Sequence, residues 1–266
     1  MSHSEFHADL SELDLPDGRR ILAPDPLYAK LLWQSVSQDP FYGAAAADLS
    51  AGDVVLDIGA NIGLTTLRFV AATPGIRAIA AEPAPVSHAA LHANLDRHAP
   101  GCAAVRAAVG SACGTAELTY YPRSPANSTL HPDLEDSVEV SRTYLRNAGL
   151  SESARAQREP ALVAKFQHIS RAVVPVTTMD ELMARFDVER VALVKIDVER
   201  AELEVLDGIG DATWPRIDRL VVEVHDLDHR VDRVTERLGG RGYRVDAAQD
   251  PSMAGTNIYM VNASRR

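Results

Sequence analysis

The sequence predicts an α/β protein: a mostly parallel β-sheet of seven strands with helices on both faces. Short apolar runs alternate with segments whose apolar residues recur at helical spacing, which is typical of a parallel sheet with right-handed crossovers. A glycine-rich turn joins the first core run to a helix pattern. The last two runs are joined by a short connection that suits a hairpin, so the final strand is expected to be antiparallel. Ligands of such sheets bind at the carboxyl ends of the strands.

Seven apolar runs predict the core strands, and they lie around Val54, Ile76, Ala103, Leu193, Leu220, Tyr243 and Ile258. Two more runs, 114–121 and 171–177, also predict strands, and Pro175 indicates that the second is an edge strand. Helical spacing predicts the helices 26–36, 86–98, 151–169, 178–186, 201–206 and 228–238.

Length and composition narrow the class of protein. The chain has 266 residues, of which 46% are apolar and 24% charged, as expected of a globular domain with additions. A net charge of −10 argues against a nucleic-acid-binding surface. The sequence has no apolar run long enough for a membrane span, and its start, 1–15, lacks a signal-peptide pattern, so we expect a cytoplasmic protein with no membrane partner. Cys102 and Cys113 fit neither a disulfide framework nor a metal site and are interpreted as structural.

The chain divides into an N-terminal helical and extended segment, 1–48, and a domain, 49–263, that carries an insertion, 121–172. Turn-forming residues and a charged tract without clear period fill 122–149. A long irregular insertion in a compact domain is commonly a lid or a binding loop, and a surface decoration is the alternative.

The turn after the first core strand predicts a ligand site. Gly59 and Gly63 flank Asn61, where backbone and ligand can approach closely at the start of a helix. Glu82 follows the next strand, 25 residues after Asp57, near the spacing expected of an acid that binds ribose hydroxyls. A carboxylate there would repel a 2′-phosphate, which argues against NADP. The alternatives are a turn that only packs helix against sheet, and a solvated Glu82.

Two later strands also end in charged residues. Lys195, Asp197 and Glu199 alternate along the chain, so on an extended strand they project to one face. Glu223 and His225 end the strand 219–225. Such groups are costly to bury unless they pair or bind something.

Taken together, these motifs resemble the FkbM family of S-adenosylmethionine-dependent methyltransferases. The resemblance covers about 49–261 in order, and it is carried by VLDIGANIG at 55–63, EP at 82–83, KIDVE at 195–199, LDG at 206–208 and VVEVH at 221–225. The segment around Tyr120, Tyr121 and Asn127 also resembles members found with polyketide and nonribosomal peptide assembly lines.

The resemblance implies a class I methyltransferase fold, which is Rossmann-like, and S-adenosylmethionine as the cofactor. Carried over, it assigns the cofactor's methionine part to Asp57, Gly59 and Asn61 and its ribose hydroxyls to Glu82, which Pro83 follows. It places Ala108 and Val109 beside the adenine, and Asp197 near the amino group and the sulfonium. The family usually has glycine where this chain has Arg200, which puts the turn after Glu199 in question.

Methyl transfer to an alcohol needs a group that takes the hydroxyl proton. His225 is the predicted base, with Glu223 or Asp197 orienting it; a structural His225, or a base on the insertion at His131 or His168, is the alternative. No metal is assigned in this interpretation. The alternative is a divalent ion such as Mg²⁺, bound by donors from the set Asp197, Glu223, His225 and Asp226.

The sequence therefore predicts an O-methyltransferase that acts on a hydroxyl or carboxyl of a small specialised metabolite, such as a polyketide or nonribosomal peptide, either free or bound to a carrier protein. The alternatives are a sugar or glycan hydroxyl as acceptor, and a non-catalytic module that binds a nucleoside or a partner. NAD-linked redox chemistry is disfavoured, because the turn reads Gly-Ala-Asn-Ile-Gly and not G-x-G-x-x-G.

Overall fold

The computed structural model describes residues 10–265, so the first nine residues of the predicted segment 1–48 lie outside the described residues. Its main sheet has seven strands in the order β11-β12-β10-β9-β3-β4-β5, and all seven predicted core strands are in it. Strands β3, β4, β5, β9 and β10 are parallel, whereas β12 is antiparallel to both β10 and β11. The bounds are β3 Val54–Ile58, β4 Arg77–Ala81, β5 Ala103–Val105, β9 Leu193–Ile196, β10 Arg219–His225, β11 Arg244–Ala248 and β12 Ile258–Ser264.

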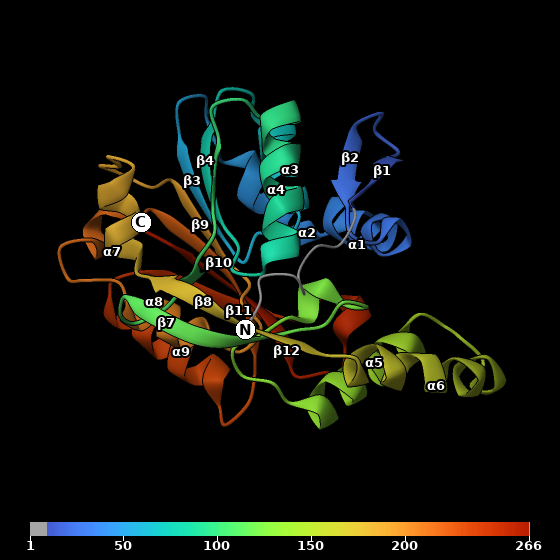
Figure 1. The fold of residues 1–266 in the computed structure, drawn as a ribbon. Coiled ribbons are helices and arrows are strands. Elements are labelled where there is room, and N and C mark those ends of the chain that lie inside the picture. Colours follow the sequence, from blue (N-terminus) through green and yellow to red (C-terminus); the bar gives the residue numbers. More distant parts are fainter. Residues whose placement is uncertain (1–9, 266) are drawn as a thin grey trace.

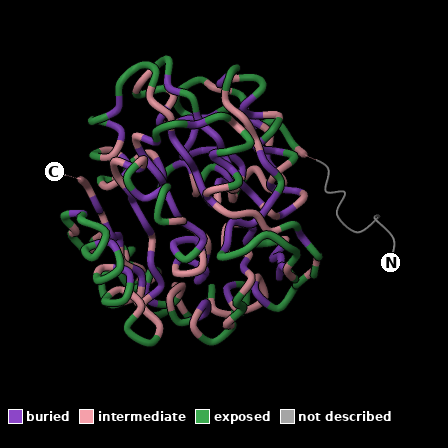
Figure 2. Tube along the Cα trace, turned by 90° about the vertical axis from the view of Figure 1, so that its left-hand side faces the viewer, coloured by how far each residue is buried: buried purple, intermediate pink, exposed green. Residues whose placement is uncertain are grey.

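Helices cover both faces of this sheet, as predicted (Figure 1). Alternation along the strands explains the two layers. Val55, Leu193 and Val221 belong to a core cluster with Phe69 of α3, while their neighbours Leu56, Val194 and Val222 belong to the cluster on the other face. The purple central strands in Figure 2 show how completely both layers bury the sheet. One face carries α2 Pro40–Ala47, α3 Leu64–Ala72 and α4 Pro85–His98, and the other carries α7 Met179–Arg185, α8 Glu202–Asp207 and α9 Arg230–Gly240.

A second sheet of three strands has the order β6-β8-β7, with β6 Ala108–Val109, β7 Gly114–Tyr120 and β8 Ser170–Thr177. The predicted edge strand 171–177 is thus the middle strand, which corrects the prediction. β6 pairs only with Val176 and Thr177, so Pro175 has a strand partner on the β7 side alone. The missing N–H of proline is tolerated because β6 is so short.

The insertion is more regular than predicted. Asp133 caps a helix, α5 Leu134–Asn147, in the tract expected to be irregular, and α6 Glu152–Gln167 follows in the predicted place. Both helices project from the sheet on the same side (Figure 1). Only Val138 and Leu145 of α5 pack in the cluster shared with α6, because most other side chains of α5 are charged or polar. Because so few residues of α5 pack against α6, the sequence pattern did not predict this helix.

The N-terminal segment forms a hairpin, β1 Ser11–Asp14 and β2 Arg20–Ala23, followed by α1 Pro26–Gln38. The Asp25 side chain accepts hydrogen bonds from the first backbone N–H groups of α1. Trp33 of α1 is buried against α3, with the Arg19 guanidinium over its ring. This packing fixes α1 beside the carboxyl ends of the central strands. Short 3₁₀ helices occur at Pro125–Asn127, Trp214–Arg216 and Pro251–Met253. Within residues 10–265, no helix combines the length and the apolar character needed to cross a bilayer.

Candidate active site

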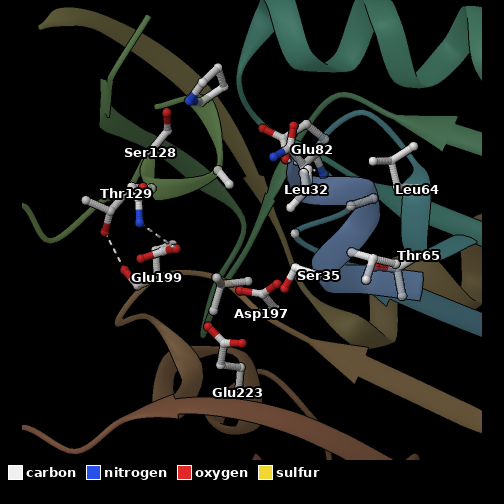
Figure 3. A pocket seen from close by; sticks show the side chains of 18 of the residues that line it. Leu32, Ser35, Leu64, Thr65, Glu82, Ser128, Thr129, Asp197, Glu199 and Glu223 are labelled. Carbon is white, nitrogen blue, oxygen red and sulfur yellow. Dashed lines mark hydrogen bonds between the residues drawn. The ribbon is translucent and has the colours of Figure 1, made fainter. Parts of the chain in front are cut away.

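A cavity of about 820 Å³ opens at the carboxyl ends of β3, β4, β9 and β10 (Figure 3). On one side it is lined by residues that directly follow these strands, and on the other by α1 and the insertion. Its volume is near the upper end of the range for ligand pockets, about 300–1,000 Å³. The predicted site residues that line it are Gly59, Asn61, Glu82, Pro83, Ala108, Val109, Asp197 and Glu223.

The glycine turn wraps closely around the end of β9. Gly59 has φ +78°, and a Cβ on it would lie 1.8 Å from the backbone oxygen of Asp197, so no other residue fits without moving the turn. Asn61 has φ +50° and lines the cavity. Its buried amide lies near the Tyr28 hydroxyl but is not aligned for a full hydrogen bond with any described residue. Buried amides normally have well-aligned partners, so this amide has capacity left for a polar ligand.

Glu82 is held with its carboxylate at the cavity wall. Oε2 accepts a hydrogen bond from the backbone N–H of Asn61 at 2.9 Å, and Oε1 accepts one from that of Ala84 at 2.8 Å. Burial raises the pKa of the Glu82 carboxyl to about 7, although these two hydrogen bonds lower it. Each oxygen can accept one more hydrogen bond, which suits a pair of vicinal hydroxyls.

Asp57, which was predicted beside the methionine part of the cofactor, is not among the residues that line the cavity. Its carboxylate is fully buried, accepts a 2.5 Å hydrogen bond from the Thr66 hydroxyl and lies 3.3 Å from Lys195 Nζ. Lys195 Nζ also lies 3.2 Å from Asp197 and donates to the Gly59 carbonyl at 2.7 Å. Burial alone would lower the pKa of Lys195. The carboxylates of Asp197 and Asp57 outweigh this effect and raise the pKa above its ordinary value, so the ammonium stays charged. The role of Asp57 is to hold the lysine that locks the glycine turn to Asp197.

A third wall is apolar. Pro83 lines the cavity with Ala108 and Val109 of β6. Ala108 packs against β7 and β8, whereas Val109 packs in the core of the main sheet. The strand predicted around Ala103 stops at Val105, and the chain enters the other sheet as β6. A flat, apolar group such as a nucleobase fits between these residues and the glycine turn.

Glu199, Glu223 and His225 meet at the end of the cavity. Glu199 and Glu223 line it, whereas His225 is only 3% exposed and does not. The His225 Nε2 lies 3.3 Å from Glu199 Oε2. Burial lowers the pKa of His225, but the adjacent carboxylate of Glu199, with the charges of Glu202 and Glu223, raises it to about 9. An imidazole that is already protonated at neutral pH takes up no further proton, so neither position nor charge supports His225 as the direct base.

Glu199 and Arg200 form a turn with left-handed backbone, at φ +54° and +84°. β9 ends at Ile196, so Glu199 is oriented by this turn and not by strand alternation. The insertion holds the turn: the Thr129 hydroxyl donates to the Glu199 carbonyl, and Asn127 Nδ2 donates to Glu199 Oε1 at 3.4 Å. Arg200 keeps the conformation that glycine would adopt easily.

The Arg200 side chain binds the first turn of α5, donating to Asp136 at 2.6 Å and to Ser137 at 2.9 Å. Its backbone N–H donates to Glu202 at 2.7 Å, and its carbonyl accepts from Arg230 at 2.8 Å. These contacts offset the backbone strain, which is of order 1–3 kcal/mol for such a residue.

Sequence reasoning missed most of the opposite wall. Tyr28 of α1 lines the cavity, and its hydroxyl accepts a hydrogen bond from the Ala126 N–H at 3.0 Å. Neither His131 nor His168 is among the lining residues, and His131 pairs with exposed Glu204 at 2.6 Å. This wall comes mostly from α1, α5 and α6. It combines polar residues, such as Ser35, Asp39 and Ser141, with a larger set of apolar and cationic ones: Leu31, Leu32, Val140, Tyr144, Leu145, Arg158, Leu162 and Lys165.

The seven-stranded sheet and its strand-end cavity are those of a class I, S-adenosylmethionine-dependent methyltransferase. Residues 57–245 match the profile of the methyltransferase FkbM domain. The chain belongs to the FkbM methyltransferase family. The turn at Gly59, the buried Asn61 amide and the Glu82 oxygens fit the family's nucleoside cofactor.

Similar proteins act in different settings. The chain is 36% identical over 254 residues to the 31-O-demethyl-FK506 methyltransferase FkbM of Streptomyces tacrolimicus, with 95% of this chain and 96% of that protein covered. It is 30% identical to part of the antimetabolite synthetase AmbE of Pseudomonas aeruginosa, spanning 96% of this chain but 12% of the synthetase. A solved FkbM methyltransferase from Methylobacillus flagellatus shares the fold, with a TM-score of 0.51 and 13% identity over 90% of this chain and 61% of that one.

Proposed function

We propose that this methyltransferase transfers the methyl group of S-adenosylmethionine to a hydroxyl oxygen of a small specialised metabolite. The observation that carries this proposal is the acidic lining of the cavity end. Asp197 and Glu199 line it and would repel an acceptor carboxylate, whereas a hydroxyl can donate a hydrogen bond to either of them. Glu223 also lines it, and burial and the charge of Asp197 raise the pKa of its carboxyl well above the ordinary value. The name of the relative from Streptomyces tacrolimicus, an O-methyltransferase of FK506, supports the same class of acceptor.

The cofactor would lie across the strand ends. Glu82 would accept hydrogen bonds from the ribose hydroxyls, and Ala108 and Val109 would contact the adenine. Asn61 and Asp197 would bind the methionine part, with the Asp197 carboxylate close to the positively charged amino and sulfonium groups. Lys195 fixes Asp197 at 3.2 Å, so this carboxylate is oriented before the cofactor arrives.

Methyl transfer from a sulfonium is an in-line displacement, and alignment of donor and acceptor is its main requirement. The acceptor oxygen attacks the methyl carbon while the carbon–sulfur bond breaks and its electron pair stays on sulfur. The products are a methyl ether, S-adenosylhomocysteine and the proton of the hydroxyl. The protein's part is to hold the hydroxyl at Glu199 and Glu223, facing the methyl, and to exclude water with α1 and the insertion.

The acceptor wall indicates a largely apolar metabolite. Leu31, Leu32, Tyr144 and Leu162 supply apolar surface, while Lys165 and Arg158 supply the cations. This composition suits a lipophilic scaffold with one or more hydroxyls.

Incubation with S-adenosylmethionine carrying a tritiated methyl group tests the proposal. The acceptors are a panel of hydroxylated macrolides and peptides, including 31-O-demethyl-FK506, and their carboxylic acid counterparts. We expect alkali-stable label, as methyl ethers give. Alkali-labile methyl esters would contradict hydroxyl transfer. Cofactor binding without transfer to any acceptor would favour the non-catalytic module.

A further inference from the structure

We infer that Glu199, Glu223 and His225 form a binding site for a divalent transition-metal ion at the acceptor end of the cavity. One ligand atom from each residue lies within 4.8 Å of the other two. Ligand atoms at about 2.0–2.2 Å from one ion in a tetrahedral site are about 3.3–3.6 Å apart. His225 Nε2 and Glu199 Oε2, at 3.3 Å, already have this separation. Two separate chain segments supply the ligands, because Glu199 follows β9 and the other two end β10.

His225 is the observation that points to a ligand. It is 3% exposed, and neither of its ring nitrogens has a hydrogen-bond partner among residues 10–265. Its Nε2 lies 3.3 Å from Glu199 Oε2, within ion-pair distance, but the two groups are not aligned for a hydrogen bond. Buried imidazoles are normally hydrogen-bonded or bound to a metal.

The surrounding charges favour a cation. Among the described residues, Glu223 has neither a hydrogen-bond donor nor an ion-pair partner for its carboxylate, and Glu199 has no Lys or Arg partner. Two nearby cations are used elsewhere: Lys195 binds Asp57 and Asp197, and Arg230 binds Glu202. Lys165 lines the cavity and its charge acts on Glu199, but the two form no ion pair among residues 10–265. Two carboxylates held this close repel each other, and a cation between them removes that repulsion.

The donor set indicates which ions fit. Carboxylates alone suit Mg²⁺ and Ca²⁺, whereas imidazole suits Zn²⁺ and Fe²⁺, so a mixed set favours Mn²⁺, Fe²⁺ or Zn²⁺. Of the predicted alternative ligands, Asp197 is paired with Lys195, and Asp226 accepts from the Val231 N–H at 3.0 Å, so neither completes the cluster.

The ion's role in catalysis rests on the proposed function. Glu199 and Glu223 face the cavity, so the remaining coordination positions are open to the acceptor oxygen. Coordination lowers the pKa of a hydroxyl. The hydroxyl would release its proton to solvent, and the resulting oxygen anion would attack the methyl carbon. This supplies the deprotonation that His225, away from the cavity, is not placed to perform.

Mn²⁺ binding to the full chain, freed of metal with EDTA, tests the inference by electron paramagnetic resonance and calorimetry. We expect one Mn²⁺ per chain, with affinity reduced about tenfold or more in Glu223→Gln and Glu199→Gln. Glu223→Asp keeps the charge but shortens the side chain, and it should alter the Mn²⁺ spectrum even if Glu→Gln variants fold poorly. The matched control is His92→Ala with Asp96→Asn, which removes an exposed pair 3.1 Å apart on α4 and should bind Mn²⁺ normally.

Absent stoichiometric binding, or binding equal in wild type and the cluster variants, would overturn the inference. S-adenosylmethionine titration in the presence of EDTA separates the two proposals. Normal cofactor binding and turnover in EDTA would agree with the proposed function and would contradict a role for the ion in catalysis. Loss of turnover in EDTA that Mn²⁺ restores in wild type but not in Glu223→Gln would support both.

Discussion

The two sides of the cavity are built in different ways. The cofactor side consists of backbone turns and buried charges at strand ends, such as Gly59, Lys195 and Glu82. The acceptor side consists of helices whose mutual contacts include exposed ion pairs, such as Arg142–Glu159 between α5 and α6 at 2.5 Å. Buried, strained contacts tolerate little change, whereas exposed pairs contribute about 0–1 kcal/mol each. The cofactor side can therefore keep the same residues in enzymes that methylate different acceptors, while the residues of the acceptor side vary.

Lys195→Met should have the largest effect on the cofactor side. It leaves buried Asp57 without its cation and frees Asp197, which we expect to cost about 3–5 kcal/mol in urea unfolding. Arg190→Met, which breaks an exposed pair with Asp218, is the control and should cost less than about 1 kcal/mol. Equal losses of unfolding free energy in the two variants would mean that buried Lys195 does not stabilise the glycine turn.

Gly59→Ala should come next. Its Cβ would overlap the Asp197 backbone oxygen, so we expect a loss of about 3 kcal/mol and of measurable S-adenosylmethionine binding in calorimetry. Gly101→Ala has the same kind of positive φ, at +100°, but nothing within 4 Å of its Cβ. It should cost only about 1 kcal/mol and keep cofactor affinity. Normal binding by Gly59→Ala would show that the turn can move.

Glu82→Gln should weaken S-adenosylmethionine about 10- to 100-fold, because hydrogen bonds to a charged acceptor are worth about 1.5–3 kcal/mol. The pKa of about 7 adds a pH dependence: the carboxyl must lose its proton to accept both ribose hydroxyls. In wild type, affinity should therefore be constant above pH 7 and fall about tenfold per unit below it. Calorimetry across pH should show that the cofactor affinity of Glu82→Gln does not depend on pH. If the affinity of this variant fell below pH 7 as in wild type, another group would be responsible for the titration.

Arg200 joins the two sides, and two substitutions separate its roles. Arg200→Ala and Arg200→Gly both remove the pair with Asp136, but only glycine relieves the left-handed backbone. The glycine variant should be the more stable of the two by about 1 kcal/mol in urea. Both should make the α5–α6 connection, 148–151, more sensitive to protease. Equal stabilities would mean that the turn relaxes without strain.

Much of the cofactor side could be predicted from the sequence, because strand ends with glycine or acidic residues are local patterns. Gly59, Glu82 and Asp197 needed only strand, turn and helix signals. The surroundings of their neighbour Asp57 could not be predicted, since its direction depends on Thr66 and Lys195, which are distant in sequence.

The insertion was expected to be a lid or a binding loop, and it lines the cavity. Its individual contacts could not be predicted, because they join segments about 100 residues apart, such as Tyr28 with Ala126. The α5 helix was also missed, since its apolar residues are divided between the cluster with α6 and the cavity wall. Likewise, no spacing in the sequence indicates that Glu199 lies beside His225; that depends on the left-handed turn at Glu199 and Arg200.

The arginine in that turn also limits how chimeric enzymes can be made from this scaffold. Replacing 121–172 with the insertion of a relative would remove Asp136 and Ser137. The buried guanidinium of Arg200 would then lose these two hydrogen-bond acceptors. A graft should therefore carry the donor's residue at position 200 along with its helices. To change substrate range by exchanging the insertion, the residue at position 200 must therefore be substituted together with the insertion.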